Sequence, residues 1–362
     1  MKYYDEYRDK ELCQALIAKI SSLTEESFTF MEVCGTHTIS IFRSGIKDLL
    51  PENIHLISGP GCPVCVTPIS DIDRIIALSR MDNTIIVTFG DMINVPGSTS
   101  SLKREKAIGA DIRIIYSPSQ ALDIALEFPG KKVILVGIGF ETTVPLLASV
   151  VLEAKEKNIN NFYLLSLGKL MPPIIKALLG SHEARIDGML CPGHVSAIIG
   201  SKPYQFIPDS YGIACVIAGF EPVDILIAIY HLIMQNINKD PRVENKYKRA
   251  VREEGNPTAL NLINQVFIPR ESEWRGMGRV KDSGLALRSE FSGWDARNFS
   301  VVAEITKENE QCLCGEVLRG VITPLQCPLF RKVCTPGNPI GACMVSGEGV
   351  CAAYYKYSSV KG

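Results

Sequence analysis

Short runs of valine, isoleucine and leucine alternate with helical segments along the first two thirds of this 362-residue chain. Near-continuous apolar runs of this length are typical of parallel strands that are buried on both faces. Helical patterns between them, such as 141–157 and 222–237, complete β-α-β units. The pattern therefore predicts an α/β fold on parallel sheets. Its strands are expected at 28–33, 54–58, 84–89, 112–116, 132–138, 162–166, 186–190 and 213–218.

The eight predicted strands fall into two groups of four, which indicates two similar, small parallel-sheet α/β domains. We assign the first domain to 28–118 and the second to 119–239. The alternation stops near residue 240, so 240–362 is predicted to form a third, mixed and loop-rich domain. The remaining segment, 1–27, carries leucine and isoleucine at helical spacing over 8–22 and is expected to pack on the third domain.

The third domain ends in four cysteines, Cys327, Cys334, Cys343 and Cys351. Six, eight and seven residues lie between successive cysteines. Proline and glycine crowd the sequence between them. Proline lacks a backbone donor and glycine favours bent backbone, so this segment is not expected to be a regular helix or a central strand. A loop that gathers four sulfur ligands suits an iron–sulfur cluster or a zinc ion. Cys312 and Cys314 lie too close together for an ordinary disulfide and are alternative ligands.

Composition limits the partners and the compartment. The 38 lysines and arginines nearly balance the 39 aspartates and glutamates without forming a basic stripe, which argues against nucleic-acid binding. The polar start does not resemble a signal peptide, and no apolar run approaches the ~20 residues of a membrane helix. We therefore expect a cytoplasmic protein. In that reducing compartment, its 12 cysteines should serve metal binding or catalysis more than structural disulfides.

Two cysteine-containing loops follow neighbouring predicted strands. CGTHT at 34–38 follows the first strand, and CPVC at 62–65 follows the second. Sites in parallel α/β sheets form at the carboxyl ends of strands, so these loops can meet in one cleft. The C-x-x-C pair can cycle between dithiol and disulfide or hold a metal. A zinc site completed by Cys34 and His37 is the alternative, and Cys–His nucleophilic catalysis is also open.

Two later loops contribute weaker candidates. GFETT at 139–143 supplies Glu141, which can also be only a favourable charge at a helix N-terminus. CPGH at 191–194 supplies His194 and Cys191, whose role stays open. Cys13 and Cys215 are expected to be small buried hydrophobes. The chain lacks a G-x-x-x-x-G-K-[ST] motif, so a partner would have to hydrolyse any nucleotide.

Taken together, MEVCGTHT, GPGCPVC, the FGDM…VPGS loop, GFETT, CPGHVS, GFEP and the closing cysteine segment resemble the HypD family of hydrogenase maturation factors. The motifs span 31–351, and their combination is specific although each alone is not. The resemblance implies a scaffold that assembles the Fe(CN)2CO unit of [NiFe]-hydrogenases. It implies that HypC binds and shares the iron, and that HypE delivers cyanide made with HypF. The unit then passes to the hydrogenase large subunit. Alone, the protein is expected to be a monomer.

The resemblance also assigns roles to residues that match the family's motifs. Cys34 would hold the iron that carries cyanide and carbon monoxide, and Cys62 with Cys65 would form a redox dithiol. The threonines of the first loop can donate hydrogen bonds, and its histidine can shuttle a proton. The cluster would be [4Fe-4S], beside the dithiol as in ferredoxin–thioredoxin reductases. The implied catalytic set is Cys34, Thr36, His37, Thr38, Cys62 and Cys65, and the implied cluster ligands are Cys327, Cys334, Cys343 and Cys351.

Two other interpretations fit the same cysteines. An iron–sulfur thiol–disulfide oxidoreductase would act on a protein disulfide without HypC and without iron at Cys34. A structural zinc protein would be colourless, whereas an iron–sulfur cluster is brown. Whether the chain is an enzyme stays open, because a metal-assembly scaffold with redox activity need not turn over a substrate.

Overall fold

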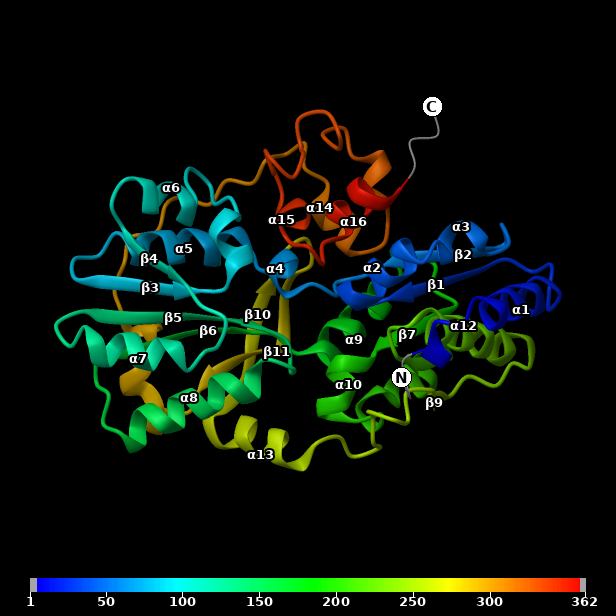
Figure 1. Cartoon of the computed structure of the whole chain (residues 1–362), viewed down its shortest axis with the longest axis horizontal. Coiled ribbons are helices and arrows are strands. Elements are labelled where there is room, and N and C mark those ends of the chain that lie inside the picture. The colour runs from blue at the N-terminus through cyan, green and yellow to red at the C-terminus, as the bar shows by residue number, and fades with distance from the viewer. Residues whose placement is uncertain (1–4, 359–362) are drawn as a thin grey trace.

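The computed structural model describes residues 5–358 and builds them on two separate parallel sheets (Figure 1). Sheet A has the strand order β2-β1-β7-β8-β9, and sheet B has the order β4-β3-β5-β6. The eight predicted strands all form. The strands of sheet A are β1 (Phe28–Glu32), β2 (Ile54–Ser58), β7 (Gly188–Pro192), β8 (Ala214–Ala218) and β9 (Val243–Asn245), and those of sheet B are β3 (Thr84–Thr88), β4 (Asp111–Ile114), β5 (Lys132–Gly139) and β6 (Phe162–Gly168).

The strand partners differ from the expected division of the chain. The groups 28–118 and 119–239 would place β1 to β4 in one sheet and β5 to β8 in another. Instead β1 pairs with β2 and β7, and β3 pairs with β4 and β5. An apolar run predicts a strand but not which strand pairs with it, because an apolar strand is buried equally well beside any other apolar strand. Sheet A also takes β9 from the expected third domain.

Helices cover both sheets, and the first of them packs differently from the expectation. α1 carries Leu16, Ile17 and Ile20 into the same core as α12, so it belongs to sheet A and not to the C-terminal part. The apolar face of α12 explains this partner, because Ile225, Leu226 and Ile229 are fully buried. The helices are α1 (Lys10–Ser21), α2 (Gly35–Arg43), α3 (Ile46–Leu49), α4 (Pro63–Val66), α5 (Ile69–Ser79), α6 (Leu102–Ala107), α7 (Gln120–Glu127), α8 (Val144–Glu156), α9 (Met171–Ser181), α10 (Gly193–Ile199), α11 (Phe206–Tyr211), α12 (Pro222–Ile237), α13 (Pro257–Val266), α14 (Cys314–Leu318), α15 (Ala342–Val345) and α16 (Val350–Tyr357).

The C-terminal part combines a hairpin with a loop-rich cysteine segment, which we define as residues 312–351. The hairpin, β10 (Phe267–Trp274) and β11 (Gly278–Leu287), is antiparallel and packs on sheet B. The cysteine segment lies above α4 and α2, between the two sheets (Figure 1). The predicted α/β class with a loop-rich C-terminal region is confirmed. Within residues 5–358, no helix is both long and apolar enough to cross a membrane.

Two of the four closing cysteines lie in short helices, contrary to the expectation for this segment. Cys343 lies in α15, and Cys351 lies in α16. Each helix begins immediately after a glycine with extended backbone, Gly341 or Gly349. The prolines of the segment all precede these helices, so they leave the helical hydrogen bonds intact.

Candidate thiol and metal site

Cys34 lies where β1 ends and α2 begins. It is the N-cap residue of α2, with extended backbone (φ −149°) and an exposed fraction of 8%. Burial raises the pKa of its thiol to about 12. The N–H groups of His37 and Thr36 lower this pKa, and the carboxylates of Glu348 and Glu32 raise it. The thiol is thus protonated in the metal-free protein, and a bound cation would favour the thiolate.

The loop that carries Cys62 and Cys65 lies directly against Cys34. The backbone N–H of Gly35 donates to the carbonyl of Gly61 at 3.0 Å. A Cβ atom on Gly61 would stand 2.3 Å from the backbone nitrogen of Cys34, so only glycine fits there. Cys62 is the N-cap residue of α4 and is disulfide-bonded to Cys65, and both are buried. The two loops therefore meet at one sheet edge, as their positions after β1 and β2 predict.

The two threonines beside Cys34 both donate to carboxylates. Thr36 Oγ1 donates to Glu348 Oε1 at 2.9 Å, and Thr38 Oγ1 donates to Glu32. Glu32 also accepts from the backbone N–H of Cys34 at 2.9 Å. Burial raises the pKa of Glu32 to about 7, although these hydrogen bonds lower it. The carboxyl group therefore titrates near neutral pH within hydrogen-bond contact of Cys34.

His37 is fully buried beneath the aromatic ring of Phe220. Its Nε2 lies 2.8 Å from the carbonyl oxygen of Gly219, so Nε2 carries the proton. Nδ1 has no hydrogen-bond partner among residues 5–358. Burial lowers the pKa of His37 to about 4, so the ring is neutral. His194 stacks on Phe220 with 3.8 Å between ring centroids, which places this predicted residue near His37.

Six cysteines line a single cavity in the cysteine segment. The rest of its wall is mainly apolar, with Leu329, Phe330 and Met344. The cavity thus gathers the four predicted cluster ligands and the two alternatives. Its cysteines are Cys312, Cys314, Cys327, Cys334, Cys343 and Cys351.

Two of these cysteines also contact each other. Cys314 Sγ and Cys343 Sγ lie 2.8 Å apart, and both are buried. This contact lowers the pKa of Cys314, which the positive charge of Arg275 also lowers, and it raises the pKa of Cys343. Cys343 follows Ala342, whose carbonyl oxygen lies 4.0 Å from Cys65 Sγ. The pair therefore lies between the cysteine cavity and the Cys62–Cys65 disulfide.

The donor set of this cavity fits an iron–sulfur cluster. Such clusters are held by four cysteine thiolates, and burial among apolar side chains tunes their potential. Among residues 5–358, no three His, Cys, Asp or Glu side chains are grouped as the ligands of one metal ion. In a [4Fe-4S] cluster each thiolate binds a different iron, so its four sulfur atoms stand farther apart than around a single ion.

Glu141 lies outside this assembly. It is 2% exposed, and its Oε1 accepts from the backbone N–H of Met171 at 2.8 Å. Burial raises its pKa to about 7, and it lines a separate, largely apolar cavity with Leu170 and Pro172. Cys191 and Cys215 contact each other. They are fully buried on adjacent strands, with their sulfur atoms 3.5 Å apart, so Cys215 is confirmed as a buried side chain.

Sequence reasoning missed the two acids that contact the first loop. Glu32 gave one signal, a carboxylate inside the apolar run FTFMEV. A buried acid at the end of a strand has to be satisfied by hydrogen bonds, which marks a site candidate. Glu348 stands between two glycines of a loop and gave no signal, because its contact with Thr36 joins residues that are distant in sequence.

Comparison with known proteins gives one consistent family. A family model described as "HypD: Hydrogenase formation hypA family" matches residues 11–358. The chain is 45% identical to the "Hydrogenase maturation factor HypD" of Cupriavidus necator, over 100% of this chain and 98% of that protein. It is 42% identical to the protein of the same name from Escherichia coli, over 99% and 98%. It is also 43% identical to the "Putative hydrogenase expression/formation protein MJ0993" of Methanocaldococcus jannaschii, over 97% and 99%.

Proposed function

Because this chain belongs to the HypD family of hydrogenase maturation factors, we propose that it is the cytoplasmic scaffold on which the Fe(CN)2CO unit of [NiFe]-hydrogenases is assembled. The observation that carries this proposal is the position of Cys34. Cys34 follows a strand of sheet A and is buried, and its backbone contacts Gly61 in the loop that carries the Cys62–Cys65 disulfide. A thiolate held on a rigid element next to a redox-active pair suits an iron that has to be bound, kept reduced and released.

In this proposal Cys34 binds the iron cargo as a thiolate. Its high pKa means that iron binding displaces the thiol proton. Glu32 is the nearest acceptor with a pKa close to neutral, and it already contacts the backbone of Cys34. Nδ1 of His37 is a second buried acceptor without a partner among the described residues. These groups can take up the proton or accept a hydrogen bond from an iron ligand without the entry of bulk water.

Cys62 and Cys65 serve as the redox pair. Oxidation of the dithiol to the disulfide forms one S–S bond and releases two electrons and two protons. In the proposed scaffold these electrons keep the iron at Cys34 reduced while cyanide is attached. We propose that the Cys314–Cys343 pair, as a dithiol, reduces the Cys62–Cys65 disulfide by thiol–disulfide exchange and becomes a disulfide itself. The contact of Cys65 Sγ with the carbonyl oxygen of Ala342, the neighbour of Cys343, supports this step.

We propose that Cys312, Cys327, Cys334 and Cys351 hold a [4Fe-4S] cluster. This set replaces Cys343 of the sequence-based set with Cys312, because Cys343 is already engaged with Cys314. Burial raises the pKa of Cys312 to about 12, and the charges of Cys314, Cys327 and Cys334 add to the rise, which indicates that these sulfur atoms lie close to Cys312. When bound, such a cluster supplies or accepts single electrons.

The partners follow from the family. We propose that HypC docks at the sheet A edge that carries Cys34 and shares the iron. HypE then delivers the cyanide that HypF prepares, and the hydrogenase large subunit receives the finished unit. Loops that follow β1, β2, β7 and β8 all reach this edge and would form the docking surface.

The test is infrared spectroscopy of the protein purified anaerobically with HypC and HypE. We expect cyanide and carbonyl bands in the wild type and none in Cys34→Ala, while both proteins keep the brown cluster colour. Cys13→Ala, a half-buried cysteine of α1, is the matched control and should keep the bands. Full hydrogenase activity in a Cys34→Ala strain would refute the scaffold role.

A second function is favoured by the disulfide beside the cysteine cavity. A thiol–disulfide oxidoreductase would reduce a protein disulfide through Cys62 and Cys65, without need of Cys34. The two functions separate in the Cys34→Ala variant, because an oxidoreductase keeps its disulfide-reducing activity there and a scaffold loses maturation.

A further inference from the structure

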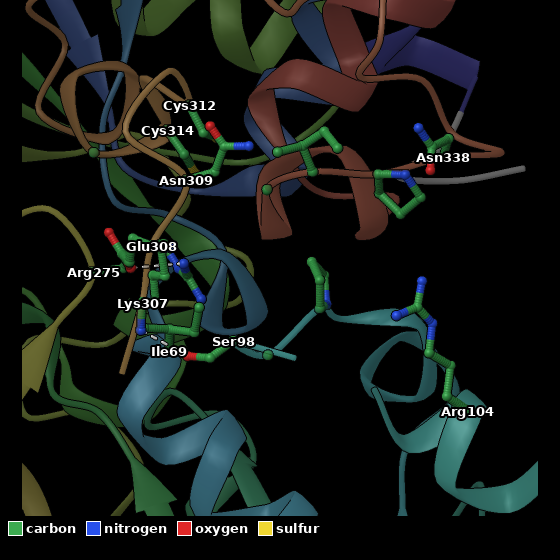
Figure 2. A pocket seen from close by; sticks show the side chains of 16 residues that line it. Ile69, Ser98, Arg104, Arg275, Lys307, Glu308, Asn309, Cys312, Cys314 and Asn338 are labelled. Carbon is green, nitrogen blue, oxygen red and sulfur yellow. Dashed lines mark hydrogen bonds and ion pairs between the residues drawn. The ribbon is translucent and has the colours of Figure 1, made fainter. Parts of the chain in front are cut away.

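A second cavity, of about 270 Å³, lies beside the cysteine cavity and shares part of its wall (Figure 2). We name it the cationic cavity. Arg275, Lys307 and Ser98 lie on one side, and Arg104 and Asn338 lie across the hollow (Figure 2). Neither the proposed iron site nor the proposed cluster uses any of these residues.

Arg275 forms the buried part of this cavity. It is only 8% exposed and lies in the turn of the β10–β11 hairpin. Its Nε donates to the carbonyl of Thr67 at 3.1 Å, and its Nη1 donates to Glu308 Oε1 at 3.0 Å. Its Nη2 is buried and has no hydrogen-bond partner among residues 5–358. The guanidinium group is therefore fixed in orientation, and one of its buried donor nitrogens lacks an acceptor.

The charges around the cavity are unbalanced. Arg275, Lys307 and Arg104 supply three cations, and Glu308 is the carboxylate in the lining. Within the described part of the chain, neither Lys307 nor Arg104 is within ion-pair distance of an acid. The side chain of Arg104 donates to the carbonyl oxygen of Thr99, at 3.4 Å. The three cations face one carboxylate. Their excess positive charge creates a positive potential in this partly enclosed space.

The neutral lining adds short-range donors and limits the size of a ligand. Asn309 and Asn338 supply two amides, while Ile69 and Pro339 supply apolar wall; the hydroxyl of Ser98 already donates to Asp73 Oδ2. Guanidinium groups bind carboxylate and phosphate through paired hydrogen bonds. We propose that the cationic cavity binds a small oxyanion, the phosphate or carboxylate group of a small molecule.

The position of the cavity gives this ligand a structural consequence. Ser98 and Arg104 belong to the sheet B part of the chain, whereas Asn338 belongs to the cysteine segment. An oxyanion held between them joins the two parts and offsets the repulsion among Arg104, Arg275 and Lys307. A ligand that binds only the folded arrangement stabilises it, and the stabilisation rises with the logarithm of the ligand concentration once this exceeds Kd. Binding should therefore protect the docking of the cysteine segment, independently of hydrogenase assembly.

Isothermal titration of the full-length protein, purified anaerobically, tests the proposal. The probes are inorganic phosphate and citrate, each at constant ionic strength set with sodium chloride. We expect saturable binding of at least one probe and a higher melting temperature in its presence. The double variant Lys307→Gln with Arg104→Gln should weaken binding by about tenfold or more, because it removes two charged donors. Both residues are exposed, so the variant should fold.

Lys332→Gln removes one exposed charge from the cysteine segment outside the cavity and is the control. It should bind like the wild type. Binding of phosphate alone identifies a phosphorylated ligand, and binding of citrate alone identifies a carboxylate ligand. The proposal is overturned if neither probe gives saturable binding, or if the double variant binds as tightly as the control.

Discussion

The two cysteine-containing regions of this protein, the Cys34 and Cys62–Cys65 loops and the cysteine segment, are held in place in different ways. Cys34 and the Cys62–Cys65 pair follow buried parallel strands, and backbone hydrogen bonds and glycine contacts fix their loops. The cysteine segment has only short helices, of which α15 is four residues long and α16 eight. Both regions contain buried cysteines, but only in the first does a β-sheet fix the positions of the cysteines.

This difference indicates what stabilises each region. The sheet A edge is held by the hydrophobic core beneath it, so it should keep its shape whether or not a metal is bound. The cysteine segment encloses a small apolar core of Val317, Leu329, Phe330 and Met344 around its cavity. Such a segment depends on its ligand, because cluster binding is coupled to folding. The predictions below test this contrast.

The largest effect should follow from serine at Cys312, Cys327, Cys334 or Cys351. Each change removes one proposed cluster ligand, so we expect loss of visible absorbance, iron and sulfide. Hydrogenase maturation should be abolished, and the cysteine segment should become sensitive to limited proteolysis. The two sheets should resist the protease better, because their buried core residues lie mostly away from the cavity, although Cys314 and Cys343 belong to both.

Cys343→Ser discriminates between the two possible ligand sets. It removes the partner of Cys314 and should leave the cluster absorbance in place. If Cys343→Ser loses the cluster and Cys312→Ser keeps it, Cys343 returns to the ligand set and Cys312 leaves it. Iron and sulfide analysis of the two purified variants decides the question.

Alanine at Cys62 or Cys65 should block maturation with little loss of stability. The disulfide closes a very short loop, with a sequence separation of 3, so its entropic contribution to stability is at most about 2 kcal/mol. We expect normal cluster absorbance and retained HypC binding, measured by co-purification. A variant that loses the cluster as well would show that the two regions are not independent.

A smaller effect should come from alanine at Gly35 or Gly61, where the backbone approaches a neighbouring loop closely. A Cβ atom on Gly35 would lie 2.5 Å from Cβ of Glu348, and one on Gly61 would meet the backbone of Cys34. We expect each variant to lose roughly 1–3 kcal/mol of stability, as overpacking typically costs, and to show slower maturation. Gly347→Ala is the matched control, because a Cβ atom there meets nothing within 4 Å. Equal melting temperatures for all three variants would contradict the close approach.

The sequence predicted the local elements and the first site better than the long-range arrangement. Eight apolar runs predicted eight strands, because burial on both faces leaves a local pattern. The meeting of the Cys34 and Cys62 loops followed from a general property of parallel sheets. The choice of strand partners did not follow, and β7 therefore could not be predicted to join β1.

The other differences between the sequence-based predictions and the structure arise from contacts between segments that are distant in sequence. The pairing of Cys314 with Cys343 depends on how α14 and α15 pack, and cysteine spacing alone does not reveal it. The contact between Thr36 and Glu348 spans the length of the chain. The buried acid Glu32 is the exception, since a carboxylate within an apolar strand was visible from the start.

A last effect, visible only as a pH dependence of stability, comes from Glu32. Its pKa in the folded protein is about 7, above the usual 4.5, because burial favours the neutral carboxyl group. The folded state thus binds this proton more tightly than the unfolded state. The resulting stabilisation is complete below about pH 4.5 and is lost as the pH rises to about 7. For a shift of this size it amounts to an order of 3 kcal/mol. Glu141 should act in the same direction, since burial raises its pKa to about 7 as well.

Glu32→Gln should therefore reduce the fall in melting temperature between pH 5 and pH 8, as measured against the wild type. Glu141→Gln should do the same from the sheet B side, and neither change should alter cluster absorbance. Only Glu32→Gln should also change the pH dependence of iron binding, because only Glu32 contacts the backbone of Cys34. If both variants changed iron binding alike, the proton displaced from Cys34 would not pass to Glu32, and the sheet A edge would lose its assigned acceptor.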